Sequence, residues 1–456
     1  MYRILRNTRA TIAAVEWHNQ IMKQSVLPEI SAPEGSFLRL GIAAVLIFLL
    51  PLAGATAAGK PFVAYLQFPP KTPELPHAPF SLPVFLGLAL LILAATAPIL
   101  LRLVSFRGGE APRKPFLPFP WWGWAGAGLG AASWILAWSR FPWMGGFQAH
   151  TFTPIWIAFI LLVNAFTVRR TGRCLMLSRP RPFLLLFPVS AGFWWSFEYL
   201  NRFVGNWRYV GVAEFGAVEY FLFATLPFST VLPAVLSTRE LLLSRPRFDG
   251  AFRDWRPLSA PRPWAIGLAA FLLSCVGLFA VGIVPDLVFP LVWVATPTLL
   301  ISLAALRREP HALSGIASGD WRPAISSVLA ALLCGFFWET WNFGSAAKWV
   351  YAIPYVDALH VFEMPLLGYA GYLPFGILCE KAIGCGTVSA AAEEPAARQR
   401  DSGRSAMQNA ANVRFRVIEP LPAKRGWRSA CTANRFYPTR CETGIFFYSS
   451  RTPPTM

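Results

Sequence analysis

Long apolar runs separated by short polar segments dominate this sequence. Ten runs approach or exceed the length of roughly 20 residues that a helix needs to cross the hydrocarbon core of a bilayer. They lie near 38–58, 81–104, 120–139, 152–168, 183–201, 215–236, 264–284, 287–306, 324–343 and 359–380. Prolines inside several runs are compatible with membrane helices, where neighbouring groups satisfy the freed carbonyls. The pattern predicts an all-α, polytopic integral membrane protein with about ten transmembrane helices.

The polar segments divide the chain into six expected parts. They are a cytoplasmic N-terminal segment at 1–37, a two-helix N-terminal extension at 38–104, a first four-helix repeat at 119–240, an Arg-rich cytoplasmic linker at 241–262, a second four-helix repeat at 263–384, and a tail at 385–456. The tail loses the apolar periodicity and is rich in Arg, Ser, Thr and Pro, which is typical of disorder. A sequencing or reading-frame change near its start is the alternative.

Composition and charge agree with a membrane protein. The chain is 55% hydrophobic and 14% charged, whereas soluble domains carry about 25% charged residues. Its net charge of +18 fits arginines that face anionic lipid headgroups better than nucleic acid, because no basic run is interleaved with nucleic-acid motifs. One set of alternate loops holds 17 Lys and Arg and the other holds 6. This bias predicts an inner (plasma) membrane protein with both termini cytoplasmic.

The cysteines and histidines form no ligand pattern. Seven cysteines are scattered, and five histidines lie far apart in the sequence. An odd number of dispersed cysteines gives no disulfide framework and no zinc spacing. We therefore expect neither a metal nor another cofactor.

A motif that occurs twice marks the candidate site. It is Glu-x-x-Asn followed by Trp-x-Tyr, and its copies are Glu198, Asn201, Trp207 and Tyr209, and then Glu339, Asn342, Trp349 and Tyr351. Each copy belongs to a four-span unit, and an even number of spans gives both units the same orientation. The sequence therefore predicts two tandem repeats related by a pseudo-two-fold axis along the membrane normal.

Four glutamates lie in or beside the predicted spans of these repeats. They are Glu198, Glu219, Glu339 and Glu363. A charged group at the membrane centre costs about 2.5–3.5 kcal/mol on insertion scales, so such groups usually face an interior or a cavity. We interpret them as catalytic acid/base groups of a shared pocket toward the outer face. The asparagines and the Trp-x-Tyr pairs are its candidate ligand-binding residues.

A structural interpretation of the same residues stays open. Glu and Asn side chains also form hydrogen bonds between neighbouring membrane helices. Trp and Tyr also anchor helices at the membrane–water interface. Under this interpretation the motif stabilises the fold and binds no ligand.

Part of each repeat resembles the lycopene cyclase domain of the heterodimeric carotenoid type. The resemblance rests on Trp207-x-Tyr209 followed by Glu219 and an aromatic run, and on Trp349-x-Tyr351 followed by Glu363-Met-Pro-Leu. It covers about 50 residues per copy. It implies duplicated multi-span units and acid-catalysed ring closure of a polyene by membrane-embedded carboxylates. The chain departs from that family in having one glutamate per copy instead of an adjacent pair after a proline.

Three functional classes follow from these patterns. The leading hypothesis is a pocket that binds or transforms a lipid or isoprenoid, with non-redox acid/base chemistry if the protein is an enzyme. The second is a transporter in which the carboxylates bind protons or cations. The third is a membrane scaffold or assembly factor in which they hold helices together.

Overall fold

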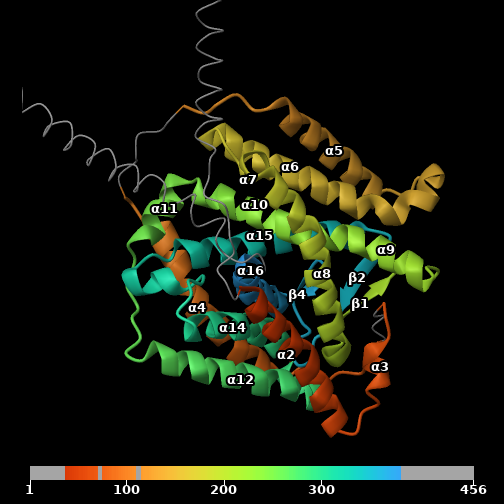
Figure 1. The fold of residues 1–456 in the computed structure, drawn as a ribbon. Coiled ribbons are helices and arrows are strands. Elements are labelled where there is room, and N and C mark those ends of the chain that lie inside the picture. The colour runs from red at the N-terminus through yellow and green to blue at the C-terminus, as the bar shows by residue number, and fades with distance from the viewer. Residues whose placement is uncertain (1–35, 70–73, 109–114, 382–456) are drawn as a thin grey trace, which may run out of the picture. The chain divides into compact units, whose positions relative to one another are not determined.

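The computed structural model describes residues 36–69, 74–108 and 115–381. Most of the predicted N-terminal segment at 1–37 and the whole predicted tail at 385–456 lie outside these residues. Within them the protein is mostly helical, with two short antiparallel strand pairs (Figure 1).

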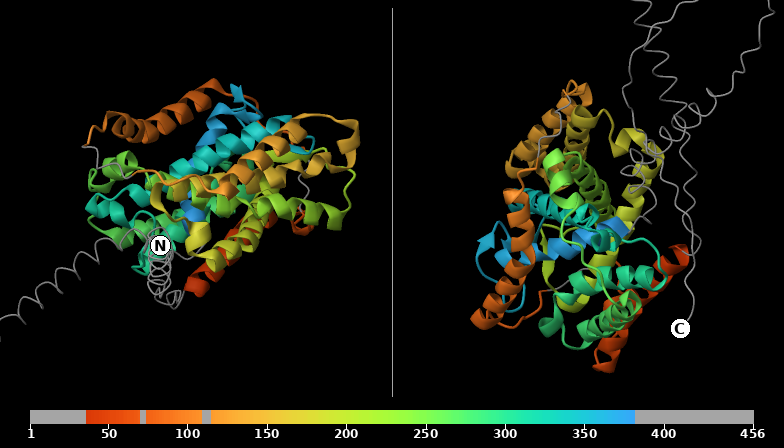
Figure 2. Two further views of the ribbon diagram at one scale, coloured as in Figure 1. Left: turned by 90° about the horizontal axis from the view of Figure 1, so that it is seen from above. Right: turned by 90° about the vertical axis from the view of Figure 1, so that its left-hand side faces the viewer.

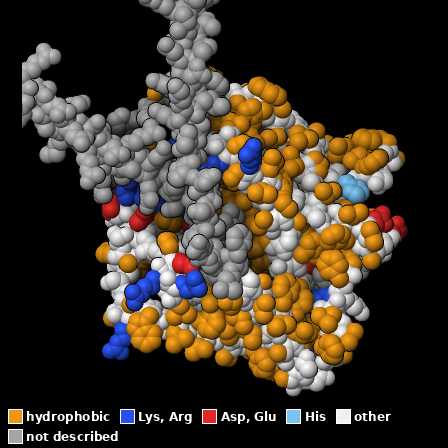
Figure 3. Space-filling view, in the orientation of Figure 1, with side chains coloured by type: hydrophobic (Ala, Val, Ile, Leu, Met, Phe, Trp, Pro, Cys, Tyr) orange, Lys and Arg blue, Asp and Glu red, His pale blue; other side chains and the backbone are white. Residues whose placement is uncertain are grey.

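Several helices have the length and composition of membrane spans. Six in the described ranges qualify: Leu82–Ser105, Pro142–Thr171, Pro180–Val204, Ala217–Leu243, Pro263–Ile283 and Arg322–Gly344. Gly41–Ala57 and Leu291–Leu306 are shorter apolar helices. Leu101 and Leu273 are 68% and 71% exposed, and apolar side chains cover much of the face seen in Figure 3. Large exposed apolar surfaces of this kind mark membrane contact. The membrane class is thus supported, and the count of about ten spans stays a prediction.

The elements follow one another in two series, which we call the first half (α5 to α10) and the second half (α12 to α16). Before and within the first half lie α2 (Ser36–Ala57), α3 (Val63–Leu66), α4 (Leu82–Ser105), α5 (Trp121–Trp138), η1 (Pro142–Thr151), α6 (Phe152–Thr171), α7 (Leu175–Ser178), α8 (Pro180–Val204), β1 (Trp207–Val210), α9 (Ala217–Phe228) and α10 (Val231–Leu243). After α11 (Pro246–Arg253) come α12 (Pro263–Ile283), α13 (Pro285–Val288), α14 (Leu291–Leu306), η2 (Ser314–Ser318), α15 (Arg322–Gly344), β2 (Lys348–Tyr351), β3 (His360–Val361), β4 (Met364–Pro365), η3 (Leu366–Gly371) and α16 (Tyr372–Lys381).

Helix packing is similar in the two halves. In the first half α5 packs on α6, and α10 packs on both α6 and α8. In the second half α12 packs on α14, and α16 packs on both α14 and α15. The halves meet where α10 packs on α15, near the centre of Figure 1. Aromatic side chains such as Trp156, Phe197 and Phe375 fill the core between these helices.

Helix α2 approaches α12 very closely because glycines face each other. A Cβ atom on Gly54 would lie 2.0 Å from the Phe279 carbonyl oxygen, and one on Gly282 would lie 2.1 Å from the Pro51 carbonyl oxygen. Small residues allow such close backbone contact between membrane helices. The N-terminal extension is therefore attached to the second half along this seam.

The predicted span at 359–380 is wrong in its first half. Residues 360–371 form β3, β4 and the 3-10 helix η3, and α16 begins only at Tyr372. Leu359 and Phe362 have positive φ values of 55° and 58°, which a helix does not allow. Pro365 also lacks the N–H group that an α-helix requires in its interior. An apolar run alone does not separate these elements from a buried helix.

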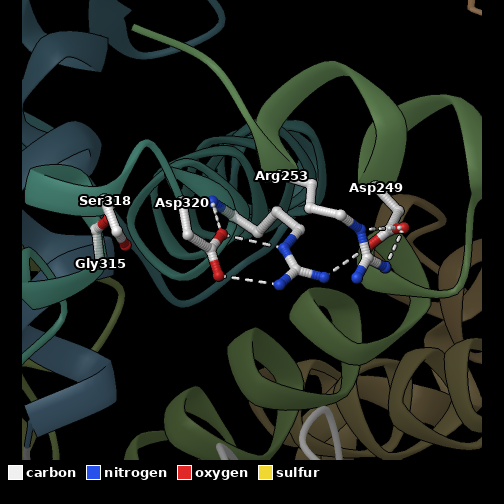
Figure 4. A network of polar contacts seen from close by, with 6 residues as sticks. Asp249, Arg253, Gly315, Ser318 and Asp320 are labelled. Carbon is white, nitrogen blue, oxygen red and sulfur yellow. Dashed lines mark hydrogen bonds and ion pairs between the residues drawn. The ribbon is translucent and has the colours of Figure 1, made fainter. Parts of the chain in front are cut away.

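The predicted Arg-rich linker contains a folded ion-pair network (Figure 4). Asp249 in α11 accepts hydrogen bonds from Arg253 (2.5 Å) and Arg322 (2.6 Å), and Arg322 also pairs with Asp320 (2.8 Å). Partial burial acts to raise the pKa of Asp249, but hydrogen bonds and charges from the two arginines outweigh it and hold this pKa below its usual value. The network joins α11 to the start of α15.

Candidate functional site

The carboxylate of Glu198 lies buried near the end of α8. Its Oε1 atom accepts three hydrogen bonds, from Trp194 Nε1 (2.9 Å), Trp207 Nε1 (3.1 Å) and Tyr209 Oη (2.7 Å). Gly205 ends α8 in the left-handed conformation, with φ of 61°, and this turn brings β1 back beside the helix. One carboxylate oxygen therefore fixes both aromatic side chains of the strand.

Asn201 fixes the backbone of the same strand. Its Nδ2 donates to the Trp207 carbonyl (2.7 Å), and its Oδ1 accepts from the Trp207 N–H (3.3 Å). Glu198 and Asn201 are three residues apart and share a helix face. Together they hold β1 by its side chains and by its main chain.

The second half contains a related arrangement around Glu339, in which the tryptophan indole donates to the tyrosine hydroxyl. Tyr351 Oη donates to Glu339 Oε1 (2.7 Å), and Trp349 Nε1 donates to Tyr351 Oη (2.8 Å). Asn342 bonds both the carbonyl (2.7 Å) and the N–H (2.9 Å) of Trp349. The Glu-x-x-Asn and Trp-x-Tyr pattern thus recurs as a carboxylate that holds a strand by its side chains and an asparagine that holds its main chain.

The remaining donor to the carboxylate differs between the halves. Trp194 lies four residues before Glu198, and Gly335 lies four residues before Glu339. A Cβ atom on Gly335 would lie 2.4 Å from ring atoms of Tyr372. Tyr372 Oη donates to Glu339 Oε1 (2.8 Å) from α16, so glycine makes room for a donor from another helix. The Oε2 atom of Glu339 is buried without a hydrogen-bond partner among the described residues.

The two Trp-x-Tyr segments pair with each other. β1 and β2 are antiparallel, with Trp207 opposite Tyr351 and Tyr209 opposite Trp349. Figure 1 shows the two strands side by side, next to α8 and α9. The residues that each carboxylate holds therefore form one two-stranded ribbon between the halves.

The ribbon forms a wall of an apolar cavity of about 340 Å³. The other walls come from α4, α9, the start of α14, α15, η3 and the start of α16, with lining side chains that include Leu91, Phe228, Trp293, Trp338 and Leu367. Trp207, Tyr209, Trp349 and Tyr351 all line it, so the structure brings these four predicted ligand-binding residues together.

The phenols at this wall stay protonated. Burial, reinforced by the Glu198 charge, raises the pKa of Tyr209 well above its usual value. Burial and the Glu339 charge do the same to the pKa of Tyr351. Both phenols are therefore fixed hydrogen-bond donors to the carboxylates.

Helix α4 closes one side of the cavity with little packing. It has no buried residue, yet Leu88, Leu91, Ile92 and Ala95 line the cavity. Its main contacts are with α11 and η3, and it lies at the side of the helical bundle in both views of Figure 2. The cavity thus has a wall that is itself exposed to the surroundings.

Neither of the other two predicted glutamates lines the cavity. Glu219 is exposed at the start of α9, where its Oε2 accepts from the Gly216 N–H (3.4 Å) as a helix cap. Glu363 lies in the β3–β4 turn and pairs with Lys348 (2.5 Å). Asn201 and Asn342, predicted as ligand-binding residues, instead bond the strand backbones.

Three contributors to the site were not predicted. Trp194 donates a hydrogen bond to Glu198, and Tyr372 donates one to Glu339. Lys348 lines the cavity at the start of β2. The sequence does contain a signal that could have identified Tyr372. Tyr372 lies 141 residues after Val231, and both residues directly precede a Leu-Pro pair. That offset equals the separation of Glu198 and Glu339.

The described residues contain no group of three or more His, Cys, Asp or Glu side chains that would hold a metal ion. Comparison of the chain with protein-family models, with curated proteins and with solved structures gave no match. The function is therefore argued from the site itself.

Proposed function

We propose that this protein is an inner-membrane protein that binds an apolar lipid, of isoprenoid type in the first instance, in the cavity beside the β1–β2 ribbon. The observation that carries this proposal is the use of two buried carboxylates to fix the aromatic wall of one apolar cavity. A buried carboxylate is costly in a membrane. Because two such carboxylates hold the same ribbon, we infer that the position of its aromatic side chains matters for binding a ligand.

The dimensions and chemistry of the cavity support this class of ligand. Its volume of about 340 Å³ falls within the range of roughly 300–1,000 Å³ for small-molecule sites. The Trp207 indole and both phenols of the ribbon donate to the carboxylates, and the Trp349 indole donates to the Tyr351 hydroxyl. Their ring faces remain for a hydrocarbon chain, which aromatic rings contact favourably. Because α4 packs loosely on one side, we propose that the ligand enters from the bilayer.

In its enzyme form the proposed site carries out non-redox proton transfer. Tyr351 and Tyr372 line the cavity and donate to Glu339, and Tyr209 lines it and donates to Glu198. The tyrosines are then the groups that touch a ligand. The two glutamates act through them as positioning residues and as proton acceptors.

We further propose that the halves are tandem repeats in parallel orientation, with both chain termini in the cytoplasm. The equivalent contacts of Glu198 and Glu339 and the symmetric pairing of β1 with β2 support a two-fold relation. The arginine bias of the loops supports the orientation. The ligand would then lie at the junction of the repeats, toward the outer side.

A proton-coupled transporter is the second candidate, favoured by a polar seam between α10, α15 and α16. Arg239 bonds Ser327 (3.0 Å) and pairs with Glu380 (3.5 Å), and Ser327 also donates to Glu380 (3.1 Å). On α15 the same seam contains Cys334, which contacts Thr238 of α10 (3.5 Å), before it reaches Glu339. Buried ionisable groups at both ends of a helix trio are typical of proton relays.

The experiment that tests lipid binding blocks the cavity from α4. Ala95 lines the cavity, and its neighbour Ala94 is exposed and does not. Ala95→Trp and Ala94→Trp add the same side chain to the same helix. Both variants and the wild type are purified from membranes, and the co-purifying lipids are identified by mass spectrometry.

We expect a defined lipid to co-purify with the wild type and with Ala94→Trp, and to be absent from Ala95→Trp. If all three proteins carry the same bulk lipid, the lipid-binding function is wrong. Proton flux in proteoliposomes that Glu339→Gln abolishes would then favour the transporter.

A further inference from the structure

Two arginines at the end of α6 stack on one aromatic ring. The guanidinium carbons of Arg169 and Arg170 each lie 5.4 Å from the centre of the Phe116 ring. The Leu117 N–H donates to the Arg169 carbonyl (2.8 Å), and this bond fixes the segment that carries Phe116. The ring therefore holds two like charges close together at a defined place.

A third arginine adds to this positive charge. Arg245, at the start of α11, lies near enough to Arg170 for the two charges to repel. Within residues 115–381 no side-chain ion pair or hydrogen bond joins Arg169, Arg170 or Arg245 to a carboxylate. The Nε atom of Arg170 is buried without a partner in the same residues.

The carboxylate of Glu240 is engaged elsewhere. Its Oε2 accepts a hydrogen bond from the Leu175 N–H (2.6 Å), and it interacts electrostatically with Arg173, Arg179 and Arg239. Arg170 lies close enough to Arg245 to feel its like charge. The three-arginine cluster therefore keeps its positive charge.

We propose that Arg169, Arg170 and Arg245 form a binding site for a phosphate group, supplied by the headgroup of an anionic lipid. Guanidinium groups bind phosphate oxygens with paired, charge-assisted hydrogen bonds. The cluster lies at the end of a predicted span, on the side where the arginine bias predicts the cytoplasm, and anionic lipids concentrate there. A phosphate would relieve the repulsion between the three cations. This site is separate from the cavity and does not depend on the proposed function.

The test measures lipid binding to the full-length protein by native mass spectrometry, with phosphatidylglycerol and phosphatidylcholine as probes. The variants are Arg169→Gln/Arg170→Gln and, to avoid any change at the helix end, Arg245→Gln alone. Arg262→Gln is the matched control for Arg245→Gln, because Arg262 is exposed on the same linker and its replacement also removes one charge. Thermal unfolding in detergent with added inorganic phosphate tests the free anion.

The double variant is expected to lose about tenfold or more in affinity for phosphatidylglycerol, as the loss of charge-assisted hydrogen bonds implies. Arg245→Gln is expected to lose less, and Arg262→Gln to match the wild type. Stabilisation by phosphatidylglycerol but not by inorganic phosphate identifies a lipid headgroup, and stabilisation by both identifies a general phosphate site. Equal phosphatidylglycerol affinity in all four proteins, or no preference over phosphatidylcholine, overturns the proposal.

Discussion

The environments of Glu198 and Glu339 are built alike but completed differently. Glu198 receives three donors, and all of them come from α8 and the strand that follows it. Glu339 receives Tyr351 from its own strand and Tyr372 from α16, and its Oε2 atom has no partner among the described residues. The first carboxylate therefore takes its donors from one helix–strand unit, whereas the second takes donors from its own strand and from another helix.

This difference indicates what each carboxylate stabilises. Loss of Glu198 would remove side-chain hydrogen bonds between α8 and β1, while loss of Glu339 would remove hydrogen bonds from α15 to both β2 and α16. A shift of α16 would also change the donors of Glu339 and leave those of Glu198 in place.

The largest effect is expected from removal of the carboxylate that receives more hydrogen-bond donors. Glu198→Leu leaves three donors without their acceptor, and Glu339→Leu leaves two tyrosine hydroxyls without theirs. Each orphaned donor costs about 1–3 kcal/mol, so we expect Glu198→Leu to lower the unfolding free energy by roughly 3 kcal/mol or more. The measurement is the thermal unfolding midpoint in detergent, and an equal or larger loss for Glu339→Leu would contradict the comparison.

The motif residues of this site were predictable because their spacing encodes the contacts. Glu198 and Asn201 share a helix face, and Trp207 and Tyr209 share a strand face, so the pattern alone predicts their proximity. The antiparallel pairing of β1 with β2 was not predictable, because it joins segments far apart in the sequence. The role of Tyr372 was also missed, because the run that contains it resembles a continuous span.

A double-mutant cycle can convert the second site into the first. Gly335→Trp alone places a side chain into the Tyr372 ring, and overpacking of this kind costs typically about 1–3 kcal/mol. Tyr372→Val alone leaves a cavity beside Glu339. The combined variant restores the pair found in the first half, Trp194 with Val231, so we expect it to be more stable than the sum of the single changes predicts.

The unfolding midpoints of the four proteins of this cycle give the coupling between the two positions. The control is Gly335→Ala, whose Cβ atom meets the Tyr372 ring but brings no indole N–H to the carboxylate. Combined with Tyr372→Val, this control should recover less stability than Gly335→Trp does. Additive effects of Gly335→Trp and Tyr372→Val would show that Trp194 and Tyr372 are not alternative donors.

The asparagines are expected to behave alike in the two halves. In Asn201→Asp and Asn342→Asp the side chain still accepts from the tryptophan N–H. It then places a second oxygen against the carbonyl to which the amide donated. We expect each change to cost about 1–3 kcal/mol, with similar losses of the unfolding midpoint. A loss in one half only would mean that just one strand depends on its asparagine.

The position of the two other glutamates shows where sequence reasoning reached its limit. Glu219 and Glu363 follow the two Trp-x-Tyr pairs at similar distances, which suggested matching roles. The structure puts Glu219 at a helix start and Glu363 in a hairpin turn, because the chain after β2 forms β3, β4 and η3 where the first half has α9. Burial and backbone conformation separate them, and neither is evident from spacing.

The smallest expected difference concerns the arginines that begin α8 and α15. Arg322 pairs with Asp249 and Asp320, whereas Arg181, its counterpart before a proline 141 residues earlier, is exposed and makes no ion pair within the described residues. We expect Arg322→Gln to lower the unfolding free energy by about 1 kcal/mol, as for a partly exposed ion-pair network, and Arg181→Gln to leave it unchanged.

The stabilisation by this network should also depend on pH, because the pKa of Asp249 is lowered in the folded protein. The stabilisation is present above the pKa of Asp249 in the unfolded chain, about 3.9, and is lost as the pH falls through the pKa in the folded protein. The midpoint difference between wild type and Arg322→Gln should therefore persist at neutral pH and shrink under acid. A difference that stays constant through that range would assign it to helix packing instead of charge.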